Sequence, residues 1–324
     1  MPLLTVFTPT YNRLRTLRRT YASLCRQTSY DFLWLVVDDG SYDQTKQWVE
    51  SLGDVIEQSG TSYNWMGEPD TSASGCHFLV ITTQFQIEYI YKPNGGLYTA
   101  YNAAYSIIKS ELCVCIDSDD YLPDNAVEVI SSLWRNKGSD KYCGIEGLDF
   151  DIKSMSPIGG FFPNDLTEVY LNDLYSRRIH RGDTTQVMRT ALMKEVIPQI
   201  GFEGEKNFNP IYLLLKVCDK YPLLVYNDCL CIVDYQYGID SMSQSIFNQY
   251  IDSPRSFAKM RLQEMTLVHN TQLDRFRSAV HYVSSCLLSR DKEWLRNTPR
   301  QFLTLLAVPF GLALYLYIKH KTKK

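Results

Sequence analysis

Residues 112–120 read LCVCIDSDD, an uncharged apolar run that ends in a cluster of acidic side chains. Buried strands of parallel sheets are apolar on both faces, and residues 112–116 have that composition. Asp117, Asp119 and Asp120 would repel one another at a strand end unless a cation offset their charge. Mg²⁺ and Mn²⁺ prefer such oxygen ligands. The stretch predicts a buried strand followed by a metal site, with a solvated turn before a helix as the alternative.

Similar β-branched apolar runs precede this one at 3–8, 32–37 and 87–91. Residues with helical spacing follow these three runs and the run at 112–116, at 14–24, 45–52, 99–108 and 124–134 respectively. Asn12 is a candidate cap for the first helix. The alternation predicts an α/β fold, with a doubly wound, mostly parallel sheet and helices on both faces.

The rest of the chain divides by pattern. Residues 59–74 are rich in Ser, Thr, Gly and Pro and predict a surface loop. Further strands are expected at 145–151, 221–226 and 230–235, and two helices between 257 and 294. We therefore expect a main domain at 1–235, whose halves are 1–130 and 131–235, a helical extension at 236–301 and a tail at 302–324.

Charge and cysteine content restrict the class of protein. The net charge is -3 and the isoelectric point about 6.0, so no general attraction to nucleic acid is expected. The nine cysteines form no CxxC pair, and the first residues lack a signal-peptide pattern. These features favour the reducing cytoplasm.

The tail has a different composition. Residues 302–318 read FLTLLAVPFGLALYLYI without a charge, and lysines follow at 319, 321, 323 and 324. This length is at the lower limit for a membrane-spanning helix. The run predicts either a buried C-terminal helix or insertion into or across one leaflet, with the lysines at the cytoplasmic face.

Polar motifs follow the other predicted strands too. In open α/β sheets, ligands bind beyond the carboxyl ends of the strands. Asp38 and Asp39 could accept the imide N–H of a uracil ring or form an ordinary turn. Residues 92–96, KPNGG, offer a cation and flexible backbone next to a helix start, which suits a diphosphate but is also common turn chemistry.

Together these motifs resemble a known family. TPTYNR (8–13), VVDDGSYD (36–43), KPNGGLYTAYNAA (92–104) and CIDSDDYLPDNAVE (115–128) are similar, in order and spacing, to the catalytic domain of family-2 glycosyltransferases. The resemblance covers about the first 130 residues apart from 59–86. It implies the GT-A fold and a hexosyltransferase-like enzyme that transfers a sugar with inversion from a nucleoside-diphosphate sugar, commonly UDP-linked, using Mg²⁺ or Mn²⁺.

The resemblance also implies roles for single residues. Asp119 would be the principal metal ligand, with Asp117 near the ribose and metal. Asp39 would contact the base with Asp38 beside it, and Asp120 would support the donor sugar. The other expected nucleotide-sugar contacts are Pro9, Tyr11, Arg13, Lys92, Asn94, Gly96, Asn102 and Ser118.

Inversion calls for a general base that takes the proton of the acceptor hydroxyl. The segment GFEGEKNF (201–208) is similar to the place where the family has a catalytic acid, often in an acidic pair. Here Gly204 separates Glu203 from Glu205, and we favour Glu205. An exposed acidic loop is the alternative, and Asp183 could shape the acceptor site or cap a helix.

The leading expectation is a transferase that builds a cell-surface glycan or lipid-linked oligosaccharide at the membrane. A non-catalytic nucleotide-sugar-binding or scaffold protein is the alternative, because the acidic pair is irregular. A sugar-1-phosphate nucleotidyltransferase would need a glycine-rich basic loop after the first strand, where this chain has TPTYNR.

Overall fold

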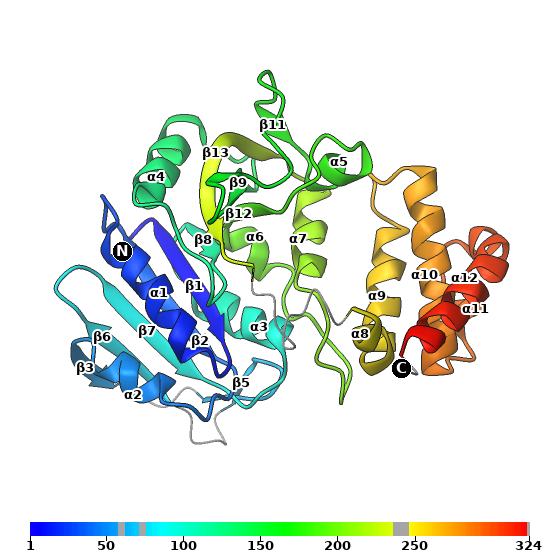
Figure 1. Cartoon of the computed structure of the whole chain (residues 1–324), viewed down its shortest axis with the longest axis horizontal. Helices are drawn as coiled ribbons and strands as arrows, with labels where there is room; N and C mark the ends of the chain where they lie inside the picture. The colour runs from blue at the N-terminus through cyan, green and yellow to red at the C-terminus, as the bar shows by residue number, and fades with distance from the viewer. Residues whose placement is uncertain (58–61, 71–75, 236–245, 323–324) are drawn as a thin grey trace.

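A mixed β-sheet forms the centre of the molecule (Figure 1), in a computed structural model that describes residues 1–57, 62–70, 76–235 and 246–322. The strands in chain order are β1 (Leu4–Thr10), β2 (Phe32–Asp38), β3 (Asp54–Glu57), β4 (Ser62–Tyr63), β5 (Pro69–Asp70), β6 (His77–Ile81), β7 (Gln86–Tyr91), β8 (Leu112–Cys115), β9 (Gly144–Asp151), β10 (Ser156–Pro157), β11 (Glu168–Val169), β12 (Thr184–Arg189) and β13 (Leu223–Val233). The order across the main sheet is β11-β13-β9-β12-β8-β1-β2-β7-β6-β3, with β10 beside β9.

The parallel part of the sheet is its middle. Strands β8, β1, β2 and β7 are parallel neighbours, whereas β6 and β3 on one side and β12 on the other are antiparallel. The predicted α/β class is confirmed. Strands β9 and β13 form a second parallel pair, and β12 runs between β8 and β9 in the opposite direction, so the sheet is mixed.

Helices cover both faces of the sheet. They are α1 (Leu14–Cys25), α2 (Thr45–Glu50), α3 (Leu97–Ile107), α4 (Ala126–Lys137), α5 (Leu171–Ser176), α6 (Thr190–Lys194) and α7 (Ile211–Cys218). Side chains of α1, α2 and α4 form one core with Val6 and Trp34, and side chains of α3, α5, α6 and α7 form the other with Phe7 and Leu35. Neighbouring strand residues therefore supply opposite cores, because side chains alternate across a strand.

Several local expectations differ from the structure. Residues 62–70 of the expected surface loop form the small β4–β5 sheet, and Tyr63 in it is only 1% exposed; residues 59–61 and 71–74 lie outside the described residues. The two strands expected at 221–226 and 230–235 form one strand, β13, whose pairing with β9 is irregular in the middle. Asn12 does not cap α1: its side chain accepts from the backbone N–H of Tyr42. Asp43 instead accepts from the N–H of Leu14 at the start of that helix.

The chain ends in a helical extension beside the main domain (Figure 1). Its helices are α8 (Ile246–Asp252), α9 (Pro254–Glu264), α10 (Gln272–Ser289), α11 (Trp294–Asn297) and α12 (Gln301–Lys321). Ala258, Tyr282 and Ala307, from α9, α10 and α12, share one core. The expected start of this extension, at 236, falls within 236–245, outside the described residues.

Candidate active site

The central strands bring the sequence motifs to one edge of the sheet. Because β8, β1, β2 and β7 are parallel, their carboxyl ends lie side by side at that edge (Figure 1). The segments that begin at Tyr11, Asp39, Lys92 and Ile116 leave the sheet there. Motifs that are far apart in the sequence are therefore neighbours along one rim, where open α/β sheets bind ligands.

The acidic cluster after β8 is compact. Oxygens of Asp117, Asp119 and Asp120 all lie within 4.8 Å of one another. The guanidinium of Arg13 donates to Oδ2 of Asp119 at 3.2 Å. Asp120 accepts from the backbone N–H of Asp234 at 3.2 Å. The cluster thus combines three carboxylates with a single arginine contact from the end of β1.

Burial and mutual repulsion disfavour the ionised forms of two of these carboxyls. Desolvation, followed by repulsion from Asp119, raises the pKa of Asp117 to about 6. Desolvation, followed by repulsion from Asp117 and Asp119, raises the pKa of Asp120 to about 8. Such uncompensated negative charge fits a cation, and hard divalent cations take carboxylate oxygens. The residues present therefore fit a divalent metal, with Asp117, Asp119 and Asp120 as the ligand set.

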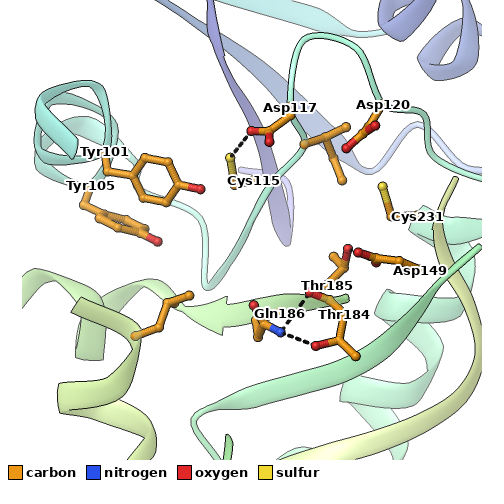
Figure 2. A pocket seen from close by; sticks show the side chains of 12 residues that line it. Tyr101, Tyr105, Cys115, Asp117, Asp120, Asp149, Thr184, Thr185, Gln186 and Cys231 are labelled. Atoms are coloured by element: carbon orange, nitrogen blue, oxygen red, sulfur yellow. Dashed lines mark hydrogen bonds between the residues drawn. The ribbon is translucent and has the colours of Figure 1, made fainter. Parts of the chain in front are cut away.

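A pocket of about 170 Å³ lies next to the cluster (Figure 2). Asp117 and Asp120 line one side of it, and Asp149 and Thr185 line the opposite side. Tyr101 of α3 closes part of the wall. The acidic cluster therefore faces a cavity walled by the second half of the main domain.

Asp149 is the site residue that the sequence reasoning missed. One of its carboxylate oxygens accepts from the Thr185 hydroxyl at 2.7 Å. Desolvation, with repulsion from Asp183 and Asp117, raises the pKa of Asp149 to about 7. In the sequence it stands inside a predicted strand without a flanking motif. Only the pairing of β9 and β12 beside β8 brings it to the pocket.

A second polar cluster joins the ends of β2 and β7. The ammonium of Lys92, which is 0% exposed, forms an ion pair with Asp39 and donates to the Thr99 hydroxyl at 2.7 Å. Asp39 also accepts from the backbone N–H groups of Gly95 at 3.0 Å and Gly96 at 2.9 Å, and from the Asn94 amide. Burial raises the pKa of Asp39 and lowers that of Lys92, whereas their mutual attraction opposes both shifts.

This network changes the expected role of Asp39. Its two carboxylate oxygens already accept four hydrogen bonds, about the full capacity of the group. The expected contact of Asp39 with a nucleotide base stays a prediction, and it would require one of these hydrogen bonds to be exchanged. Asp39 fixes the loop that starts α3. Its neighbour Asp38 accepts from the Tyr89 hydroxyl and from the backbone N–H of Ser41, each at 2.7 Å.

Other expected contact residues fall into buried and exposed groups. The buried amide of Asn102 hydrogen-bonds to the backbone of Met66 and Gln199, and its expected donor contact stays a prediction. Pro9 is buried within β1, and Ser118 is 8% exposed. Tyr11 is 45% exposed, and its ring meets that of Tyr42 edge to face, 6.2 Å between centroids. Tyr11 and Arg13 therefore remain open to a ligand at the rim.

The structure gives the expected base, Glu205, a different environment. Its carboxylate accepts from the backbone N–H groups of Arg255 at 3.1 Å and Ser256 at 2.7 Å, and pairs with the Arg255 guanidinium at 2.9 Å. These groups form the first turn of α9. A carboxylate held there stabilises the helix start. Glu205 therefore anchors the extension, and its role as a base stays a prediction. Glu203 is exposed and is not among the residues that line the pocket.

Comparison with known proteins supports the family resemblance. The model of "Glycosyl transferase family 2" matches residues 5–62 and 67–148. The chondroitin synthase and the hyaluronan synthase of Pasteurella multocida are each 29% identical to this chain over 129 residues. That match covers 40% of the chain and 10% of each synthase, so the chain matches about a tenth of their length. A validoxylamine A glucosyltransferase of Streptomyces hygroscopicus is 50% identical over 58 residues, 17% of the chain and 14% of that protein.

Solved structures support the fold. S. aureus TarS 1-349, in a structure with UDP-GlcNAc, has a TM-score of 0.56 and 18% identity, and the match covers 95% of this chain and 79% of that one. Full TarS gives a TM-score of 0.57 at 16% identity, over 99% of this chain and 55% of that one. At such identities the likeness concerns the fold alone, and it confirms the expected GT-A architecture. The part of the chain that the family model matches, between residues 5 and 148, resembles glycosyl transferase family 2 as the sequence motifs predicted.

Proposed function

We propose that the chain transfers a sugar, with inversion, from a nucleoside-diphosphate sugar to a glycan or lipid-linked acceptor. The observation that carries this proposal is the compact group of Asp117, Asp119 and Asp120 at the mouth of a pocket on the ligand-binding edge of the sheet. When bound there, Mg²⁺ or Mn²⁺ would neutralise charge on the leaving diphosphate. Arg13 adds a positive charge beside Asp119. We propose a UDP-linked donor, as the motifs of the family imply.

The general base is a separate part of the proposal. We propose Asp149 for it, because it lines the pocket opposite the acidic cluster while Thr185 orients one of its oxygens. The acceptor oxygen would bond to the anomeric carbon as the bond to the diphosphate breaks, and Asp149 would take the hydroxyl proton. A base with a pKa near neutrality suits this step.

Donor binding tests the function directly. We expect calorimetry to show binding of UDP, and of one or more UDP-sugars, that is strengthened at least about tenfold by Mn²⁺ or Mg²⁺, since diphosphate and carboxylates share the cation. GDP- and dTDP-sugars serve as comparisons. Equal binding of UDP with and without divalent cation would contradict the proposal. Binding of a donor without any transfer to a pool of saccharide acceptors would favour the non-catalytic alternative.

Asp149→Asn tests the base. We expect a loss of transfer of about 10²- to 10⁴-fold with unchanged donor affinity, because the amide keeps the shape but cannot take the proton. Initial rates of UDP release with the acceptor pool measure this. Glu205→Gln is the matched control, and we expect it to lower the melting temperature by weakening the start of α9 while transfer continues. If Glu205→Gln stopped transfer and Asp149→Asn did not, Asp149 would not be the base.

We also propose that the enzyme works at the cytoplasmic face of a membrane, in the synthesis of a cell-surface polysaccharide. The apolar helix α12 and its basic end support this proposal. Lipid-linked acceptors lie at such an interface.

A further inference from the structure

Helix α12 exposes an apolar face. Among the described residues, α12 is the one helix that is long and apolar enough to cross a membrane. Only 22% of its apolar stretch is buried within the protein. The exposed fractions of its large apolar side chains range from 45% to 76% at Phe302, Leu305, Leu306, Phe310, Leu312 and Leu316. A continuous patch of this kind marks a surface that contacts another apolar phase.

The opposite face of α12 is packed against α10 along its length. The buried residues of α12 are Thr304, Ala307, Gly311 and Ile318, which recur at helical spacing. At Gly311 a Cβ atom would lie 2.6 Å from the Val283 side chain, so the two helices approach closely there. The helix is therefore attached to the folded extension and is not a free segment.

Its partner α10 cannot enter a bilayer. Helix α10 carries Asp274, Arg275 and Arg277, and it also packs against α9. Helix α9 is attached in turn to the main domain through Arg255 and Glu205. To cross the membrane, α12 would have to separate from α10 along its whole length, or α10 would have to enter the hydrocarbon with it. The second route would place the charges of α10 in hydrocarbon, which is costly.

The charged end of α12 indicates the partner. Lys319, His320 and Lys321 form the last turn, and the Lys319 ammonium donates to the Tyr315 hydroxyl at 3.0 Å. The Lys321 ammonium lies over the ring of Tyr317, which is 49% exposed. Basic side chains beside such a tyrosine suit the headgroup region of anionic lipid. A second copy of the chain would bury the apolar face equally well, but would bring this positive end against protein of the same composition.

We propose that α12 lies flat in one leaflet of an anionic membrane, with its exposed face in the lipid and the whole protein on one side. This inference rests on the proposed membrane-associated function and specifies its geometry. At about 1.5 Å per residue, the helix would contact the bilayer over roughly 30 Å. The attachment of α10 to α9, and of α9 to the main domain, would then hold the pocket at a constant orientation to the surface.

Vesicle flotation tests the proposal with the full chain and two triple variants. We expect the wild type to float with phosphatidylglycerol-containing vesicles and less with phosphatidylcholine alone. Phe302→Ser, Leu306→Ser and Leu316→Ser together should lower partitioning at least about tenfold, since less apolar area enters the lipid. The control, Met155→Ser, Phe161→Ser and Ile200→Ser, replaces apolar side chains exposed by 55% to 59% elsewhere and should partition as the wild type does.

A C-terminal epitope tag separates the alternatives. Protease added outside sealed vesicles should remove the tag, because a flat helix leaves both ends on that side; protection of the tag would show a spanning helix and overturn the proposal. Loss of a dimer in the α12 variant, with no vesicle binding by the wild type, would show self-association instead. Both triple variants should keep their affinity for UDP, so failure here is distinct from failure of the proposed donor site.

Discussion

Asp119→Ala is expected to abolish both cation-dependent donor binding and sugar transfer. Asp119 supplies one of the three oxygens that lie within 4.8 Å of one another, and it is the residue paired with Arg13. Without it, Asp117 and Asp120 remain, but two carboxylates hold a hard divalent cation less firmly than three. We expect at least about a hundredfold loss of transfer, the size of effect typical of groups that stabilise developing charge.

Calorimetry with UDP, in the presence and absence of Mn²⁺, measures the first effect, and rates of UDP release measure the second. Asp165→Ala removes an exposed carboxylate on a loop and serves as the control, because surface substitutions of this kind change little. If Asp119→Ala kept the Mn²⁺ enhancement of UDP binding, the metal site would lie elsewhere.

Lys92→Met is expected to destabilise the fold by about 3–5 kcal/mol, because it leaves the buried carboxylate of Asp39 without its counter-charge. Lys92 is 0% exposed and the Asp39 side chain 6%, so water cannot replace the lost contact. The Lys92 side chain is also the link between the end of β7 and Thr99 in α3. Urea unfolding followed by circular dichroism measures the change.

Two further variants make this result specific. Lys46→Met breaks the exposed ion pair with Glu50 and should change stability by less than about 0.5 kcal/mol. The double variant Asp39→Asn with Lys92→Met should be more stable than Lys92→Met alone, because it removes the unpaired charge. If Lys92→Met unfolded at the same urea concentration as the wild type, the ion pair between Lys92 and Asp39 would not stabilise the fold.

The central architecture was predictable because local sequence patterns specify it. The apolar runs that predict β1, β2, β7 and β8 match the observed strands to within a few residues, and the intervening helices follow the same rule. Strand β12 was missed because polar residues such as Gln186 alternate with apolar ones in it. Strand β6 contains the apolar run 78–81 and was missed because it directly follows the expected surface loop. Their pairing partners determine that they are strands.

The sequence alone determined the family resemblance of the first half, the rim at the ends of the parallel strands and the acidic cluster Asp117–Asp120. Each of these depends on residues close together in the chain or on a repeated strand–helix order. The tertiary structure decided which carboxylates are free. It engaged Asp39 with Lys92, assigned Glu205 to the start of α9 and brought Asp149 to the pocket. The physical reason is that a carboxylate's role depends on the hydrogen-bond donors and charges that surround it, and here those come from segments distant in the sequence.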